Sequence, residues 1–144
     1  MRIRLSVAAL GVGLVALSVA PIRAHHAFSS EFDADKPLQL SGTVSKMEWV
    51  NPHAWIHIEV KKPDGKVEEW MIEGGTPNTL MRRGVSRDTL KIGTEVKVSG
   101  YQAKDGSNRA NGRDITYPDG RKLFLGSTGT GAPYEQESKD GDKK

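Results

Sequence analysis

The sequence predicts an all-β domain with one short helix, folded as a small OB-like barrel of five to six strands. Apolar and polar residues alternate with a period of two through most of residues 38–126, which is typical of half-buried strands. Turns of the Pro-Asp-Gly and Lys-Asp-Gly kind separate the alternating segments. One helix signal falls after three strands and before two more, between strands 3 and 4, which is the element order of a five-stranded OB-type barrel. An open β-sandwich is the alternative topology.

The first two predicted strands lie on either side of Asn51-Pro52. Residues 38–45 alternate between apolar and polar side chains, and Gly42 among them is typical of a bulge. In the second strand the residues expected to face the core are Ile56, Ile58 and Val60. The outer face of that strand is then expected to carry Trp55, His57 and Glu59.

Turn and cap residues predict the other elements. Pro63-Asp64-Gly65 indicates a turn into a third strand at residues 67–72. Thr76-Pro77 indicates a helix N-cap followed by proline at the first helical position, and Gly84 ends this short helix. Strands at residues 95–101 and 110–117 and a last hairpin at 123–125 complete the predicted domain.

Residues 1–24 are predicted to be a signal peptide. Arg2 and Arg4 precede an uncharged apolar run at residues 5–20, which is shorter than the ~20 residues that a membrane-spanning helix needs. Cleavage is expected after Ala24, because cleavage after Ala20 would leave a rigid proline next to the cut. The mature protein is then periplasmic or secreted, with no membrane span. A retained membrane anchor is the alternative, although no basic stop-transfer cluster follows the run.

The mature chain is expected to have three parts. Residues 25–37 form an N-terminal arm, which Phe28 and Phe32 are expected to pin to the domain. Residues 38–126 form the OB-like domain. Residues 127–144 are predicted to be a disordered tail, because they hold too little apolar surface to offset the entropy lost on ordering.

The composition of the mature chain excludes several functions. Three of the 21 basic residues and none of the 18 acidic residues lie in the signal peptide, so the mature chain carries 18 of each. Zero net charge removes the electrostatic drive for nucleic-acid binding. The absence of cysteine excludes thiol catalysis, cysteine zinc sites and covalent haem attachment. The sequence contains neither a phosphate-binding loop nor a Gly-x-Ser-x-Gly elbow, so we expect a binding protein and no enzyme.

The four histidines indicate a candidate metal site. His25 and His26 begin the mature chain, and a free α-amine with a pKa near ~8 can lose its proton to a metal at modest cost. The amine and imidazole of His25 would chelate one ion, with His53 as the third ligand and His26 as an alternate. Nitrogen ligands of this kind suit Cu(II) first, so Cu(II) is the expected cofactor.

His57 is not expected to share this ion with His53. Four strand residues separate the two by about 13 Å, whereas nitrogens bound to one ion lie within about 4 Å of each other. Simpler interpretations also exist: the terminal histidines form a polar chain end, and His53 hydrogen-bonds its own loop. The alternative function is binding of a periplasmic partner or small ligand without metal, through Trp49, Asn51, Trp55 and His57.

Several motifs resemble a known family. They are Ala24-His25-His26-Ala27-Phe28, Phe32-Asp33, the run at residues 40–44, Glu48-Trp49-Val50-Asn51-Pro52-His53, and the segments at 80–84 and 103–107. Together they are similar to an uncharacterised family of small exported bacterial proteins, a domain of unknown function with a His-His mature N terminus and a Trp-x-Asn-Pro-His loop. The resemblance covers the mature chain up to Gly126. It implies a secreted OB-like barrel and brings no assigned activity or catalytic residue.

Overall fold

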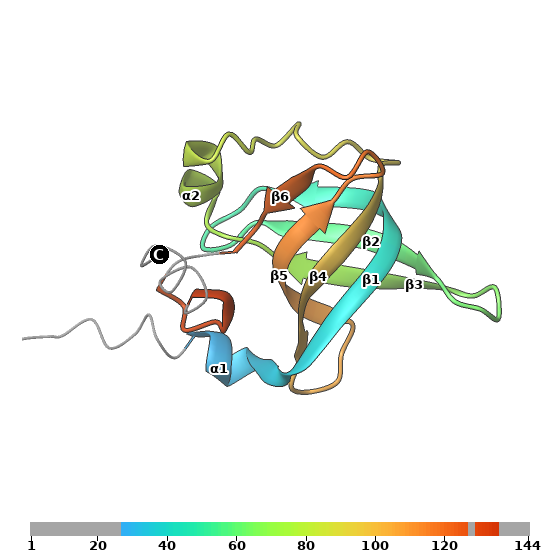
Figure 1. Cartoon of the computed structure of the whole chain (residues 1–144), viewed down its shortest axis with the longest axis horizontal. Coiled ribbons are helices and arrows are strands. Elements are labelled where there is room, and N and C mark those ends of the chain that lie inside the picture. The colour runs from blue at the N-terminus through green and yellow to red at the C-terminus, as the bar shows by residue number, and fades with distance from the viewer. Residues whose placement is uncertain (1–26, 127–128, 136–144) are drawn as a thin grey trace, which may run out of the picture.

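The fold is mostly β, with two short helices and one six-stranded sheet (Figure 1). The computed structural model describes residues 27–126 and 129–135, so the predicted signal peptide, His25 and His26 lie outside the described residues. Its elements are α1 (Ala27–Glu31), β1 (Phe32–Glu48), β2 (Trp55–Lys61), β3 (Val67–Glu73), α2 (Pro77–Arg82), β4 (Glu95–Ala103), β5 (Arg109–Thr116) and β6 (Lys122–Phe124). The predicted mostly β class is confirmed. Within the described residues, no helix is long and apolar enough to cross a membrane.

The sheet has the strand order β3-β2-β1-β4-β5-β6, and neighbours in this order run antiparallel. The two strands β3 and β5 also pair with each other, in parallel, over three residues of each strand. In that pairing Met71 lies beside Arg109, Ile72 beside Ala110 and Glu73 beside Asn111. The start of β5 therefore lies next to the end of β3. As a result, paired residues of the two strands place their side chains on the same face of the sheet.

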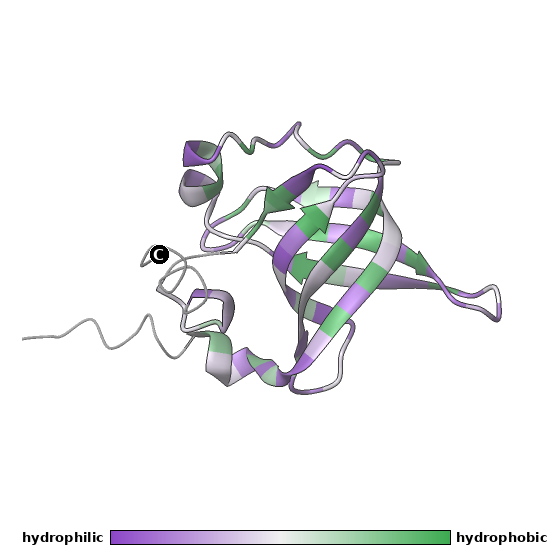
Figure 2. Ribbon diagram, viewed as in Figure 1, coloured by the Kyte–Doolittle hydropathy of each residue, from purple (hydrophilic) through white to green (hydrophobic). Residues whose placement is uncertain are grey.

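The apolar side chains of the alternating strands form the main core. Hydrophobic and hydrophilic residues follow one another along the strands in Figure 2, as the period of two predicts. The fully buried members include Val44, Ile56, Ile58, Ile72, Val98 and Ile115. Burying an aliphatic side chain of this size contributes about 1.5–3 kcal/mol to folding.

Gly42 has a different role from the predicted bulge. The register between β1 and β2 shifts between Val44 and Lys46, so the irregularity lies two residues further along. At Gly42 the backbones of β1 and β2 approach so closely that a Cβ atom would lie 2.6 Å from the carbonyl oxygen of Glu59. Glycine is required there because any side chain would collide with the neighbouring strand.

The predicted helix between the third and fourth strands is α2. Thr76 caps it with an extended backbone, and its hydroxyl accepts a hydrogen bond from the backbone N–H of Thr79 at 3.2 Å. Pro77 occupies the first helical position, as the sequence indicates. Leu80 on the inner side packs with Ala54 and Val85 in a small separate core cluster, so α2 is anchored beside the loop that joins β1 and β2.

The N-terminal arm is part of the folded unit. The sequence predicted an irregular arm up to residue 37, whereas the structure has α1 and then β1 from Phe32 onward. The β1 residues from Pro37 to Thr43 pair with β4, and Phe32 pairs with Ala103 at its far end. Phe28 and Phe32 are only 3% and 2% exposed, so they anchor the arm as expected.

Residues 129–135 pack against this arm. They belong to the segment predicted as a disordered tail; the other residues of that segment, 127–128 and 136–144, lie outside the described ones. Ala132 and Tyr134 are buried in a cluster with Phe28 and Phe32, and the backbone N–H of Phe28 donates to the carbonyl of Thr130. Figure 1 shows this segment beside α1. The ring of Tyr134 and the contacts with the arm bury apolar surface of this segment, which its composition alone did not indicate.

Glu135 holds the 129–135 segment in shape. Its carboxylate accepts hydrogen bonds from the backbone N–H groups of Gly129 and Thr130, at 2.9 and 2.7 Å, and from the Thr130 hydroxyl at 2.6 Å. Burial raises the pKa of Glu135, but these hydrogen bonds outweigh burial and hold the pKa below its ordinary value.

A pH-dependent contribution to stability follows from Glu135. A carboxyl group whose pKa is lowered by folding stabilises the protein above its unfolded pKa, near ~4.3, and this contribution is lost as the pH falls through the folded pKa. We expect Glu135→Gln to lower the melting temperature at pH 7, and the difference from wild type to shrink between pH 5 and pH 3. Thermal melts at several pH values measure it. Glu95→Gln, at the exposed start of β4, is the control, and a difference that does not change with pH would contradict the expectation.

Candidate functional site

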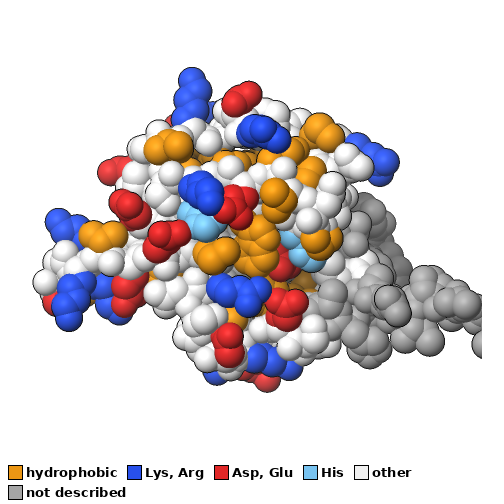
Figure 3. All heavy atoms as spheres, turned by 180° about the vertical axis from the view of Figure 1, so that it is seen from behind, with side chains coloured by type: hydrophobic (Ala, Val, Ile, Leu, Met, Phe, Trp, Pro, Cys, Tyr) orange, Lys and Arg blue, Asp and Glu red, His pale blue; other side chains and the backbone are white. Residues whose placement is uncertain are grey.

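The described histidines lie on one face of the sheet, formed by the outer side chains of β2 and β3 and the start of β5. Figure 3 shows histidine side chains on this face beside acidic ones, with hydrophobic side chains between them. His53 comes from the loop between β1 and β2, and His57 from the middle of β2. The structure does not bring the two together on one ligand, since each lies against a carboxylate of its own: Glu73 for His53 and Glu69 for His57.

His53 is held in place by a buried series of hydrogen-bonded polar side chains. Its Nδ1 lies 3.3 Å from Oε1 of Glu73. Glu73 is a buried residue, only 7% exposed. The Nδ2 group of Asn111 donates to the same Glu73 oxygen at 3.3 Å, and the hydroxyl of Tyr134 donates to Oδ1 of Asn111 at 3.1 Å. These contacts join the β1–β2 loop, the end of β3, the start of β5 and the 129–135 segment at one point.

The electrostatics around His53 favour a positive charge there. The hydrogen bond with Glu73 raises the pKa of His53 above its ordinary value, burial opposes this, and the negative charges of Glu73 and Glu31 add to the rise. Glu31 is the last residue of α1, so the arm lies close enough to His53 to influence its charge. Positive charge at this point can be supplied by a proton or by a metal cation.

Arg109 connects the arm to the tryptophan of this face. Its guanidinium group lies 2.9 Å from Oε2 of Glu31 and 5.3 Å above the ring of Trp55. A cation over an indole ring is attracted by the ring's negative face. These contacts place the end of α1 beside Trp55, on the side of the face where His53 lies. The helix itself begins directly after His26 in the sequence.

His57 faces outward as predicted but is buried. It is 6% exposed, whereas its position on the outer face of β2 led us to expect an accessible side chain. Its Nδ1 lies 2.6 Å from Oε1 of Glu69, and its Nε2 lies 3.6 Å from Oε1 of Glu48, which also forms an ion pair with Lys46. Long polar side chains from β1 and β3 surround the ring, which strand periodicity alone does not predict.

The residues of the predicted tryptophan-loop surface differ in their exposure. Trp49 is partly buried and packs against the cluster of Ala54, Leu80 and Val85. Asn51 is exposed, as is its neighbour Val50 at 48%. Trp55 is partly exposed under Arg109.

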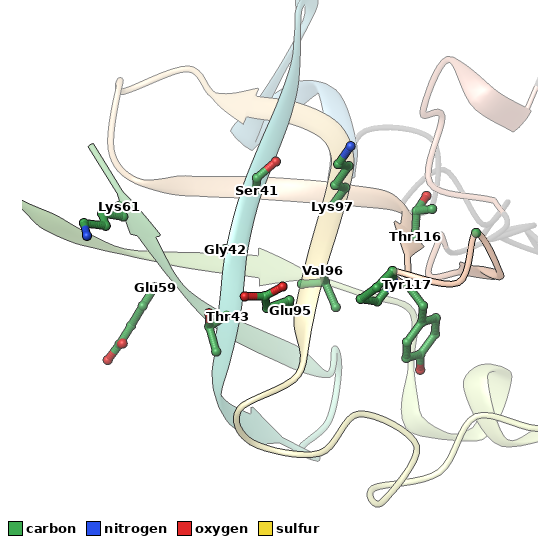
Figure 4. Close-up of a pocket in the computed structure, with 12 residues that line it drawn as sticks. Ser41, Gly42, Thr43, Glu59, Lys61, Glu95, Val96, Lys97, Thr116 and Tyr117 are labelled. Atoms are coloured by element: carbon green, nitrogen blue, oxygen red, sulfur yellow. The ribbon is translucent and has the colours of Figure 1, made fainter. Parts of the chain in front are cut away.

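A groove lies elsewhere, over β1 and β4 and beside the turn after β5. This groove has a volume of about 770 Å³ and is lined by groups that include Glu59, Lys61, Glu95 and Lys97. Figure 4 shows that its labelled side chains do not converge on a common point. Of the predicted site residues that the structure describes, none lines it.

No three metal-ligating side chains come together within residues 27–126 and 129–135. His25 and His26, the other ligands predicted from the sequence, lie outside the described residues. The residues that sequence reasoning did not single out are Glu48, Glu69, Glu73 and Asn111. For Glu69 and Glu73 a signal lay in the register of the β2–β3 hairpin, which sets Glu73 opposite Trp55 and Glu69 opposite Glu59 on one face. Glu48 and Asn111 come from β1 and β5, outside that hairpin.

The fold and this face define a small, mostly β protein with a histidine and carboxylate site. The chain belongs to a family of unknown function, DUF6152, whose model matches residues 12–112. No curated protein and no solved structure showed significant similarity to the chain.

Proposed function

We propose that this protein is an exported periplasmic binding protein that binds Cu(II). The ligands are the α-amine and imidazole of His25, the imidazole of His53, and His26 as an alternate. The observation that carries the proposal is the contact of His53 Nδ1 with the buried Glu73. A metal-binding histidine commonly donates its other ring N–H to a carboxylate, which fixes the ring and leaves the remaining nitrogen for the metal.

The strand pairings support an OB-like barrel for the domain. In the order β1-β2-β3-β5-β4 each strand pairs with the next, and β4 pairs with β1, so the sequence of pairings forms a ring. OB-type barrels bind ligands with the side that includes the loop between the first two strands. His53 comes from that loop.

The anchored arm supports the contribution of His25. Phe28 and Phe32 are buried, and Glu31 contacts Arg109 next to Trp55, so the described start of the arm is fixed to the same side of the domain as His53. His26 directly precedes α1 in the sequence. An amine brought to His53 by a fixed arm loses less entropy on binding than one on a free chain end.

Calorimetric titration with Cu(II) and Zn(II) tests the proposal. The protein must be processed by its own signal peptide and carry its tag at the C terminus, because any residue ahead of His25 removes the amine ligand. We expect one Cu(II) per chain with a nanomolar or tighter Kd, which is lost in His25→Ala and in a form extended by one Met. Weak binding, or binding that neither change affects, would overturn the proposal.

The second candidate is a partner- or ligand-binding module without metal. The Trp55 ring under Arg109, with the exposed Val50 and Asn51 in the loop that precedes it, favours this function. It predicts that Trp55→Ala weakens association with a periplasmic partner or small ligand while the copper content of the purified protein stays the same.

A further inference from the structure

We propose a second transition-metal site, formed by Nε2 of His57 and the carboxylate of Glu48 and independent of His25 and His53. The Nε2 atom is buried, and among the residues that the structure describes it has no hydrogen-bond partner. Leaving a buried polar atom without a partner costs free energy, so a ligand that pairs with Nε2 would be favoured. Oε1 of Glu48 lies 3.6 Å from it.

The ring of His57 is already oriented for a metal. Oε1 of Glu69 lies 2.6 Å from Nδ1, which fits an Nδ1–H that donates to the carboxylate. In that tautomer the lone pair is on Nε2, on the side of Glu48. This is the carboxylate–histidine arrangement that orients histidine ligands in metal sites. Since Glu69 contacts the opposite nitrogen, it supports the ring and is not itself a ligand.

The distance between the two ligand atoms fits one ion. Zinc binds nitrogen and carboxylate oxygen at about 2.0–2.2 Å, so two ligands of one ion lie within about 4 Å of each other, as Nε2 and Oε1 do here. Because no third ligating side chain joins them within the described residues, water would complete the coordination. Two protein ligands imply a weaker site than the one proposed for Cu(II), and Zn(II) and Cu(II) both suit a nitrogen and oxygen pair.

Lys46 already pairs with the carboxylate of the proposed site. Its ammonium group forms an ion pair with the same oxygen of Glu48 that faces His57. The Lys46 side chain is 59% exposed and that of Glu48 30%, so the pair lies near the surface and can be separated without disturbing the core. An entering ion would displace this ammonium group, and Lys46 therefore competes with the metal.

Zn(II) titration followed by ¹⁵N NMR of the imidazole rings tests the site. We use the full mature chain with a Met ahead of His25 and His53→Ala, so that the proposed copper site is disabled. One equivalent of Zn(II) should shift His57 Nε2 saturably. Glu48→Gln should weaken binding by at least about tenfold, while Lys46→Ala should tighten it roughly two- to fivefold, because exposed ion pairs are weak.

Two outcomes would overturn this inference. One is a His57 ring that carries protons on both nitrogens and whose signals do not shift with Zn(II) up to millimolar concentration. His57 would then be an imidazolium held between Glu48 and Glu69. The other is a Zn(II) response that Glu48→Gln leaves unchanged. Both variants replace partly exposed side chains, so loss of folding does not obscure the result, and neither outcome bears on the copper titration.

Discussion

Replacing Phe32 by alanine is expected to lower the free energy of unfolding by about 3–5 kcal/mol. Phe32 is 2% exposed and packs with Phe28, Tyr134 and Ala103. The Phe28 and Phe32 rings lie 5.8 Å apart between centroids. Truncation removes a large aromatic surface from the core and leaves a cavity between the arm and residues 129–135. Urea unfolding followed by tryptophan fluorescence measures the change.

The matched control for Phe32→Ala is Ile92→Ala. Ile92 is an exposed large aliphatic residue in the segment before β4, and its truncation should change stability by less than about 0.5 kcal/mol. A loss below about 1 kcal/mol in Phe32→Ala would mean that the arm folds separately from the sheet. In that case the arm could not deliver a ligand to a fixed position beside His53.

The sequence predicts the strands well where local signals agree with tertiary packing. The alternation of Ile56 and Ile58, the turn at residues 63–65 and the Thr76 cap each depend on neighbours in sequence. The start of β1 depends on pairing with β4 instead. Asp33, Asp35 and Pro37 are poor strand residues, and a period of two is absent there, so only the packed structure reveals that β1 begins at Phe32.

The candidate site was predictable in part. The sequence identified His53, because a histidine in a loop next to Pro52 is a local feature. It did not identify Glu73 and Asn111 as partners of His53. Those residues meet through the parallel pairing of β3 with β5, whose strands are separated by α2 and β4 in the chain. The burial of His57 was missed for the same reason, since Glu48 and Glu69 come from the two strands on either side of β2.

Glu73→Ala is expected to weaken the proposed Cu(II) binding by about 10- to 100-fold, the loss typical when the carboxylate behind a metal-binding histidine is removed. Without Glu73 the ring of His53 is free to turn, and the buried amide of Asn111 loses its acceptor. The unpaired amide should lower the free energy of unfolding by about 1–3 kcal/mol. Calorimetric titration and urea unfolding on the same preparation separate the two effects.

Tyr134→Phe is the matched control for Glu73→Ala. It removes the hydroxyl that donates to Asn111 but keeps the ring packed in the arm cluster and leaves the contact between Glu73 and His53 in place. We expect a stability loss of about 1 kcal/mol and an unchanged Cu(II) affinity. Equal losses of affinity in the two variants would show that copper binding responds to the stability of the whole network. Full Cu(II) affinity in a folded Glu73→Ala protein would show that Glu73 does not position a metal ligand, because the ring it holds would then be dispensable for binding.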